Sequence, residues 1–155
     1  MGFQIIALES EEFSYLDTMT NAQLEERSID RKVVESFPGY PCRVTLEDAP
    51  VGETVYLLNY SHLEEETPYR SSHAIYVRPK HKTARPEANE IPEIMLRRPI
   101  SLRGFDQQHR MIEIGLAEGL EVKQQLEAMF ENPQVDYIHL HNALPGCFAA
   151  KAIRT

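Results

Sequence analysis

Apolar residues in this chain fall mainly into short runs in which every second position is apolar, a pattern typical of β-strands. We predict such strands at residues 3–8, 31–36, 42–46, 54–60, 73–77, 99–105, 110–116, 135–141 and 146–154. The segments 42–46 (CRVTL) and 54–60 (TVYLLNY) are expected to form a strand pair. Because residues 54–60 are apolar on both faces, this strand is predicted to lie in the centre of its sheet.

One segment, residues 118–133 (EGLEVKQQLEAMFENP), has the longer period of a helix. Its apolar residues form a single stripe: Val122, Leu126, Met129 and Phe130. Shorter helices are predicted after Ser10 and at Thr20–Gln23, which has the form of a capping box. Strands and helices do not alternate regularly. The predicted class is α+β, a largely antiparallel β-sheet with one long C-terminal-half helix and short N-terminal helices.

A chain of 155 residues is near the commonest domain size, so residues 1–155 are expected to form a single domain. Residues 78–99 hold four of the ten prolines and are predicted to be a flexible surface excursion, the best candidate for a mobile lid. No apolar run has the length of a membrane span, and the N-terminal residues lack the features of a targeting signal. We therefore expect a soluble, cytoplasmic protein without a membrane partner.

The net charge of −8 repels a phosphate backbone and therefore argues against nucleic acid as a partner. The two cysteines are far apart and form no C-x-x-C pair, which removes the usual signature of structural zinc. The common motifs of hydrolases, kinases and nucleotide-binding oxidoreductases are missing from the sequence. The sequence favours no cofactor and leaves both the oligomeric state and enzymatic activity open.

The stretch 137–150 (YIHLHNALPGCFAA) carries two histidines on one face of a predicted strand. His139 and His141 share that face, whereas Ile138 and Leu140 share the other and are expected to face the core. Two such imidazoles are close enough to bind one metal ion, but a third ligand is needed. The candidates for the third ligand are His73, Cys147, Asp136 and Glu113. A partly exposed strand face without metal is the favoured alternative.

Cys147 is a candidate nucleophile with His139 or His73, since a neighbouring imidazolium lowers the pKa of a thiol. The alternative is a small buried apolar residue. Turn length decides between them. A two-residue turn at Pro145–Gly146 places Cys147 on the core face, which is favoured, and a five-residue loop at 142–146 places it beside His141.

A second polar cluster precedes the strand at 73–77. It consists of Tyr69, Arg70, Ser71, Ser72 and His73. A guanidinium and hydroxyl groups at the entrance of a strand can bind a carboxylate or a phosphate. Ordinary loop chemistry after Pro68 is the alternative, and it is slightly favoured.

Three segments in this order resemble the bacterial family catalogued as domain of unknown function 1203: FPGYPCRVTLEDAPVGETVYLLNYSHLEEETPYRSSHAIYVR, then LRGFD, then YIHLHNALPGCFAAKAIR. The resemblance runs from Phe3 to Arg154. The matching positions are Cys42, Arg43, Leu46, Asp48, Ala49, Gly52, Tyr69, Arg70, Arg103, Gly104, Asp106, His139, Asn142, Gly146 and Cys147. It implies a compact bacterial cytoplasmic domain and brings no established activity with it.

The resemblance also implies that relatives can have a second cysteine at the position of Thr45 and arginine at that of His141. This counts against a metal site general to the family. It favours a cleft in which Arg43, Arg70 and Arg103 hold an anionic ligand near the thiols. The full set of expected ligand-binding residues is Cys42, Arg43, Tyr69, Arg70, Ser71, Ser72, His73, Arg103 and Asn142.

The function hypothesis favoured by the sequence is the binding of a small anionic molecule in a cleft lined by Arg, Ser, His and Cys. One alternative is an enzyme that uses a Cys/His pair or a metal bound by histidine. The other is a protein-interaction or structural domain without catalysis.

Overall fold

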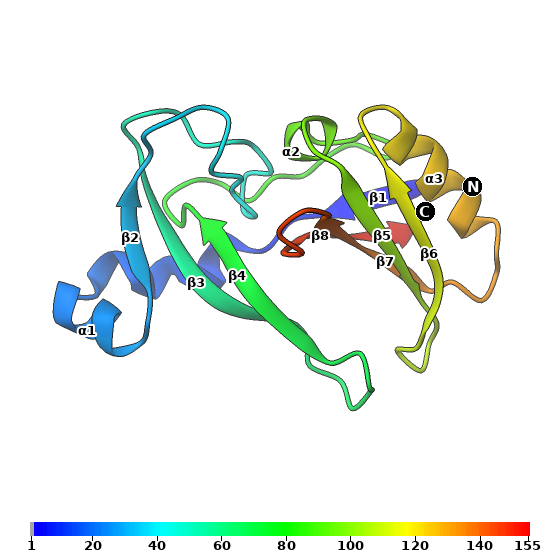
Figure 1. Ribbon diagram of the computed structural model, residues 1–155, viewed down its shortest axis with the longest axis horizontal. Coiled ribbons are helices and arrows are strands. Elements are labelled where there is room, and N and C mark those ends of the chain that lie inside the picture. Colours follow the sequence, from blue (N-terminus) through cyan, green and yellow to red (C-terminus); the bar gives the residue numbers. More distant parts are fainter. Residues whose placement is uncertain (1) are drawn as a thin grey trace.

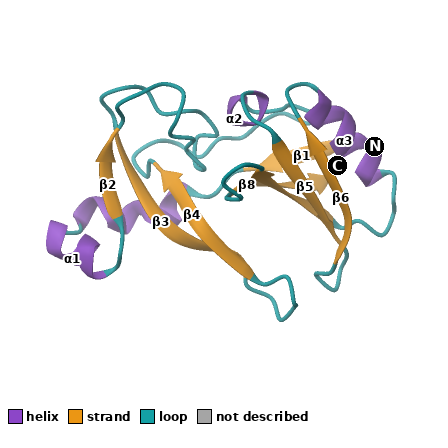
Figure 2. Ribbon diagram, in the orientation of Figure 1, coloured by secondary structure: helices purple, strands orange, loops and turns teal. Residues whose placement is uncertain are grey.

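The computed structural model describes residues 2–155 as two antiparallel sheets joined by loops and short helices (Figure 1, Figure 2). The five-stranded sheet has the order β1-β8-β7-β5-β6, and the three-stranded sheet has the order β2-β3-β4. The strands are β1 (Phe3–Ile6), β2 (Asp30–Val33), β3 (Thr54–Leu63), β4 (Ser71–Val77), β5 (Ile100–Phe105), β6 (Met111–Ala117), β7 (Tyr137–Asn142) and β8 (Phe148–Arg154). The predictions of an α+β class and of largely antiparallel pairing are confirmed.

The main core lies between the five-stranded sheet and two helices, α2 (Glu93–Leu96) and α3 (Glu121–Phe130). The predicted stripe of α3 is buried there against Ile138 and Leu140 of β7. The expected core face of β7 is therefore confirmed. Helix α3 has ten residues, so the long helix predicted over 118–133 is not confirmed.

A second core joins the three-stranded sheet to the N-terminal helices, the 3₁₀ helix η1 (Ser10–Thr18) and α1 (Asn21–Glu26). Phe13 and Leu16 of η1 are buried in it. Helix α1 begins at the predicted capping box, in which Thr20 and Gln23 bond each other's backbone N–H groups. Strand β3 lies between β2 and β4, so its predicted central position is confirmed.

The strand predicted at 42–46 is wrong, because this segment forms a compact turn rather than a partner for β3. The N–H of Leu46 donates to the carbonyl of Cys42, and the N–H of Cys42 donates to the carbonyl of Glu47. The side chains of Cys42, Val44 and Leu46 are all buried. Apolar alternation at these positions thus fills the two cores from a turn instead of a strand.

Part of the segment predicted to be a flexible excursion, residues 78–99, is anchored in the main core. Helix α2 lies within it, and the side chains of Ile94 and Met95 are fully buried. The single domain and the mobility of the rest of this segment stay predictions. Within residues 2–155, the helices are too short and too polar to cross a membrane.

The second face of the five-stranded sheet bears the histidines. His139 of β7 pairs with Arg103 of β5 and with Lys151 of β8, and His141 pairs with Ser101. Residues directly opposite each other on neighbouring strands share a face, so these side chains leave the sheet on the side opposite to Leu140. On this side, the His139 and His141 rings meet His62 from β3 of the other sheet.

Candidate functional site

A cavity of about 430 Å³ lies where the β7–β8 loop meets β4 and the segment 39–43. Its lining comes from both sheets and from the loops between them. It is formed by Gly39, Pro41, Arg43, Leu57, His73, Ala74, Tyr76, Arg98, Pro99, Asn142, Ala143, Leu144, Pro145 and Cys147. Most of these side chains are apolar, so the polar groups among them determine which ligand could be oriented there.

Arg43 is the central polar residue of this cavity, and only 1% of its surface is exposed. Its Nε donates to the carbonyl of Phe148 at 2.7 Å, and its Nη1 donates to the carbonyl of Pro41. Its Nη2 lies 3.0 Å from Sγ of Cys147. A guanidinium has five N–H donors, so these three contacts leave two donors without an assigned partner.

None of the ion pairs formed by residues 2–155 involves Arg43. Arg98, the other arginine of the cavity, is held by both carboxylate oxygens of Asp48. Burial lowers the pKa of the Arg43 guanidinium, because taking a cation out of water disfavours its charged form. Buried charges in proteins are normally paired. Arg43 is therefore a buried cation that no carboxylate of the described residues neutralises.

The β7–β8 turn places Asn142 and Cys147 beside this arginine. Residues 143–146 separate Asn142 from Cys147, and the N–H of Asn142 donates to the carbonyl of Cys147 at 2.9 Å. Both predicted turns, of two and of five residues, are wrong. The Cys147 thiol lies 3.5 Å from Nδ2 of Asn142 and contacts Arg43. Oδ1 of Asn142 is buried and has no hydrogen-bond partner among residues 2–155.

Of the residues predicted to bind a ligand, Arg43, His73 and Asn142 line the cavity together with the candidate nucleophile Cys147. Cys42 is fully buried in the turn beside Arg43 and does not line the cavity. Both cysteines are free thiols.

The predicted cluster at 69–73 is divided between different parts of the molecule. Arg70, Ser71 and Ser72 are exposed near the β3–β4 turn. Tyr69 packs edge-on against Phe105 of the other sheet. Only His73 reaches the cavity. A single anion site built from all of these residues is therefore not formed in this structure.

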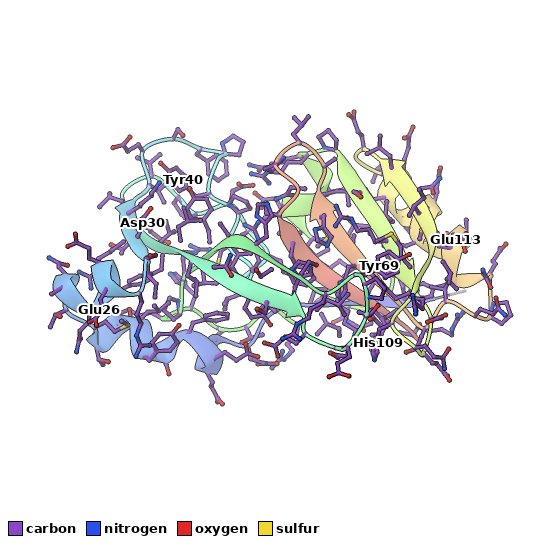
Figure 3. The ribbon with its side chains drawn as sticks, turned by 60° about the horizontal axis from the view of Figure 1, so that its bottom comes forward. Glu26, Asp30, Tyr40, Tyr69, His109 and Glu113 are labelled. Atoms are coloured by element: carbon purple, nitrogen blue, oxygen red, sulfur yellow. The ribbon has the colours of Figure 1, made fainter. Side chains whose placement is uncertain are left out.

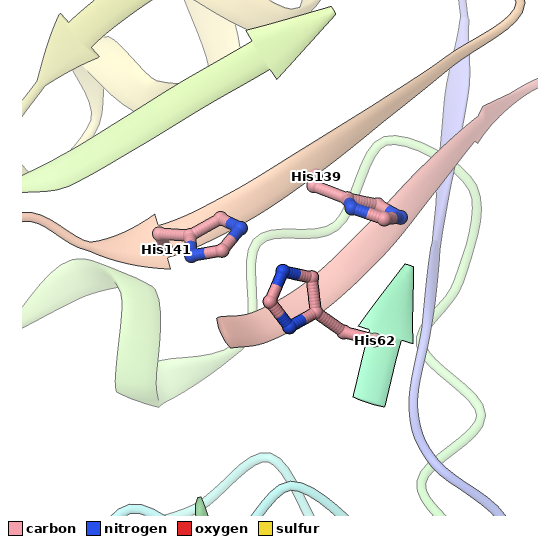
Figure 4. A group of neighbouring side chains, drawn as sticks. All are labelled: His62, His139 and His141. Atoms are coloured by element: carbon pink, nitrogen blue, oxygen red, sulfur yellow. The ribbon is translucent and has the colours of Figure 1, made fainter. Parts of the chain in front are cut away.

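A second group of polar side chains lies between the two sheets and consists of His62, His139 and His141 (Figure 4). One ring nitrogen from each lies within 4.8 Å of the others. The ring centroids of His62 and His141 are 4.8 Å apart, and those of His62 and His139 are 5.7 Å apart. The side chains of His139 and His141 are 3% and 1% exposed, so the partly exposed strand face expected for them is wrong.

Burial keeps these imidazoles neutral. It lowers the pKa of His139 to about 2, and the neighbouring His141 and His62 lower it further. Burial also lowers the pKa of His141 to about 3, against a raising effect of the hydrogen bond to the Gly146 carbonyl. For His62, burial and the charge of Arg103 lower the pKa to about 4. Neutral imidazoles keep the lone pair that a metal ion requires.

The candidates proposed from sequence as third metal ligand were His73, Cys147, Asp136 and Glu113, and none of them belongs to this group. Glu113 lies on β6 (Figure 3) and accepts a hydrogen bond from Asn132 instead. The third member is His62, which the sequence interpretation missed. His62 lies two residues beyond the strand predicted at 54–60, and nothing local to it indicates which strand of the other sheet it faces.

Residues 39–154 match the family model described as "Protein of unknown function (DUF1203)". The chain belongs to the DUF1203 family. The DUF1203 region includes every lining residue of the Arg43 cavity and all three clustered histidines. The comparisons found no match among curated proteins and none among solved structures.

Proposed function

We propose that this protein binds a small carboxylate with an apolar side chain in the cavity at Arg43. The observation that supports this proposal is a buried arginine that lines a cavity and forms no ion pair with a carboxylate of residues 2–155. A carboxylate bound at the two remaining N–H donors would balance the charge and satisfy the guanidinium. The anionic ligand expected from the sequence is thus retained, with a smaller set of residues and without the serines.

The rest of the lining narrows the chemical class of the ligand. Oδ1 of Asn142 is a buried acceptor without a partner in the described part of the chain, so the ligand is expected to carry a hydroxyl or amino donor near its carboxylate. Leu57, Ala74 and Leu144 offer apolar contacts for the rest of the molecule. A 2-hydroxy or 2-amino acid with an aliphatic side chain meets these requirements, and a cavity of about 430 Å³ accommodates it.

The thiol of Cys147 offers a different way to balance Arg43, since Sγ lies 3.0 Å from Nη2 and a thiolate would be its counter-charge. The two arrangements differ in what a Cys147→Ala substitution does. If the ligand is the counter-charge, Cys147→Ala keeps carboxylate binding, because both free donors of Arg43 remain. Loss of all binding in this variant would contradict the proposal.

The direct test measures thermal unfolding in the presence of leucine, 2-hydroxyisocaproate and their homologues. A ligand at a hundred times its Kd stabilises the folded state by about 2.7 kcal/mol, which raises the Tm of a chain of this size by roughly 5 to 10 °C. Ala74→Trp fills the cavity from an exposed position on β4 and should abolish the shift. The matched control is Ala22→Trp, on the exposed surface of α1, which should retain it.

The proposal is wrong if no acid of this panel stabilises the wild-type protein more than it stabilises Ala74→Trp. An enzyme that uses Cys147 with His73, which line the same cavity, is the second candidate; a thiol that reacts with iodoacetamide no faster than free cysteine would count against it. Three other expectations stay predictions. They are an interaction domain without a ligand, a cytoplasmic location in a bacterium, and the lack of nucleic-acid or membrane partners.

A further inference from the structure

We propose that His62, His139 and His141 bind one divalent transition-metal ion, with zinc as the best match. The three imidazoles come from two different sheets and point toward one another (Figure 4). Three histidines with one further position for an exogenous ligand form a common set for a reactive zinc centre. This site does not share a residue with the Arg43 cavity, so its test does not require the proposed carboxylate binding to be correct.

The backbone at His62 is built so that this ring can reach the other sheet. Strand β3 pairs with β4 through Ser61 and Leu63, which lie opposite Ser72 and Ser71, and His62 is the extra residue between them. A β-bulge of this kind bends the strand and changes the direction of the side chain, and bulges are frequent beside functional sites. The ring of His62 stacks on Phe148 of β8, with centroids 5.1 Å apart and an interplanar angle of 9°.

Two ring nitrogens of the cluster are not engaged in hydrogen bonds with residues 2–155 and can bind a metal ion. Nδ1 of His62 and Nδ1 of His139 are buried and have no partner among the described residues. A buried polar atom left unpaired destabilises the fold by about 1–3 kcal/mol. Two such atoms in one cluster therefore favour a role in binding. A cluster of histidines that only filled space would be expected to have these nitrogens satisfied.

Neighbouring groups hold the rings in place as they do around metal ligands. Nδ1 of His141 lies 2.9 Å from the carbonyl of Gly146, so Nδ1–H donates to it and Nε2 is left with its lone pair. Oγ of Ser71 lies 2.8 Å from Nε2 of His62 and restrains that ring. Zinc–nitrogen bonds of about 2.0–2.1 Å place tetrahedral ligand nitrogens about 3.3 Å apart. The nitrogens, which lie within 4.8 Å of one another, therefore have to approach by up to about 1.5 Å when a metal ion binds.

The charges around the cluster specify the fourth ligand. Arg103 and Lys151 lie on either side of His139 on the same face, and both repel a bare dication. An anionic ligand on the metal, such as hydroxide or a carboxylate, removes this repulsion and is stabilised by the same two cations. A cavity of about 290 Å³ adjoins His62 and His139 and is also lined by Lys151, so such a ligand has room to enter.

The test uses the full chain, purified without a histidine tag and dialysed against EDTA. Calorimetric titration with Zn²⁺ should give one ion per chain, and Co²⁺ should produce the intense visible absorption of tetrahedral coordination. His62→Gln and His141→Gln should each weaken Zn²⁺ binding at least tenfold. His81→Gln, which removes an exposed histidine that pairs with Glu53 outside the cluster, should leave it unchanged.

The wild-type titration decides the proposal even if a variant fails to fold. Wild-type protein that binds less than one Zn²⁺ per chain, or binds it no more tightly than the triple variant His62→Gln/His139→Gln/His141→Gln, would overturn it. An octahedral Co²⁺ spectrum with unchanged affinity in His62→Gln would also overturn it, because that result places the ion elsewhere.

Discussion

Acidification should destabilise the metal-free protein because of the buried histidines. In the folded chain, burial lowers the pKa of His139 to about 2 and that of His141 to about 3. The pKa of a histidine in the unfolded chain is about 6.5. Above this value both states are neutral, and the two rings add no pH dependence. Below it the unfolded chain takes up protons that the folded chain does not, so stability falls as the pH is lowered.

The size of the loss follows from the same values. Each histidine contributes about 1.4 kcal/mol per pH unit between the unfolded and folded pKa values. Lowering the pH from about 7.5 to about 5 therefore removes roughly 2 kcal/mol for each of His139 and His141, about 4 kcal/mol together. This is a large part of the 5–15 kcal/mol by which domains are usually stable.

The assay is urea unfolding in EDTA at the two pH values, followed by circular dichroism. His139→Gln and His141→Gln should each reduce the loss by about 2 kcal/mol, since glutamine does not titrate. His81→Gln, at an exposed position, serves as the control and should show the wild-type loss. A wild-type loss below about 1 kcal/mol, or a loss of the same size in His139→Gln, would refute the reasoning.

Three further outcomes are expected. Met95→Ala should lower the free energy of unfolding by about 2–5 kcal/mol because the side chain is fully buried, whereas Leu96→Ala, at a residue that is 40% exposed, should change it by less than about 0.5 kcal/mol. Similar values for the two variants would show that α2 is not part of the core. Iodoacetamide should label Cys147, which lines a cavity, before the fully buried Cys42, and peptide mass spectrometry would reveal the opposite order. Thr20→Ala should cost about 1 kcal/mol in urea unfolding by removing the cap of α1, and an unchanged midpoint would show that the cap adds nothing.

Local patterns predicted those features that depend on neighbouring residues. Alternation alone placed Ile138 and Leu140 toward the core and His139 on the opposite face, as the structure has them. The capping box at Thr20–Gln23 was equally visible, because both of its hydrogen bonds lie within four residues. Such features need no knowledge of the partner across the fold.

Features that depend on distant contacts were not predictable in the same way. The turn at 42–46 has the alternation of a strand, and only its position between two cores makes a turn more favourable. The burial of His141 depends on a second sheet that covers its face. His62 was missed because the β-bulge that turns it toward the other sheet leaves no mark on the apolar pattern.

The two candidate sites depend on one structural element, the β7–β8 hairpin. Phe148 accepts a hydrogen bond from Arg43 through its carbonyl, and its ring stacks on His62. Two residues before Phe148, the carbonyl of Gly146 orients His141, and the intervening Cys147 contacts Arg43. A shift of this hairpin by a fraction of an ångström would therefore alter both the guanidinium and the imidazole geometry. Because packed interiors transmit such shifts instead of absorbing them, occupation of one site is expected to change the affinity of the other.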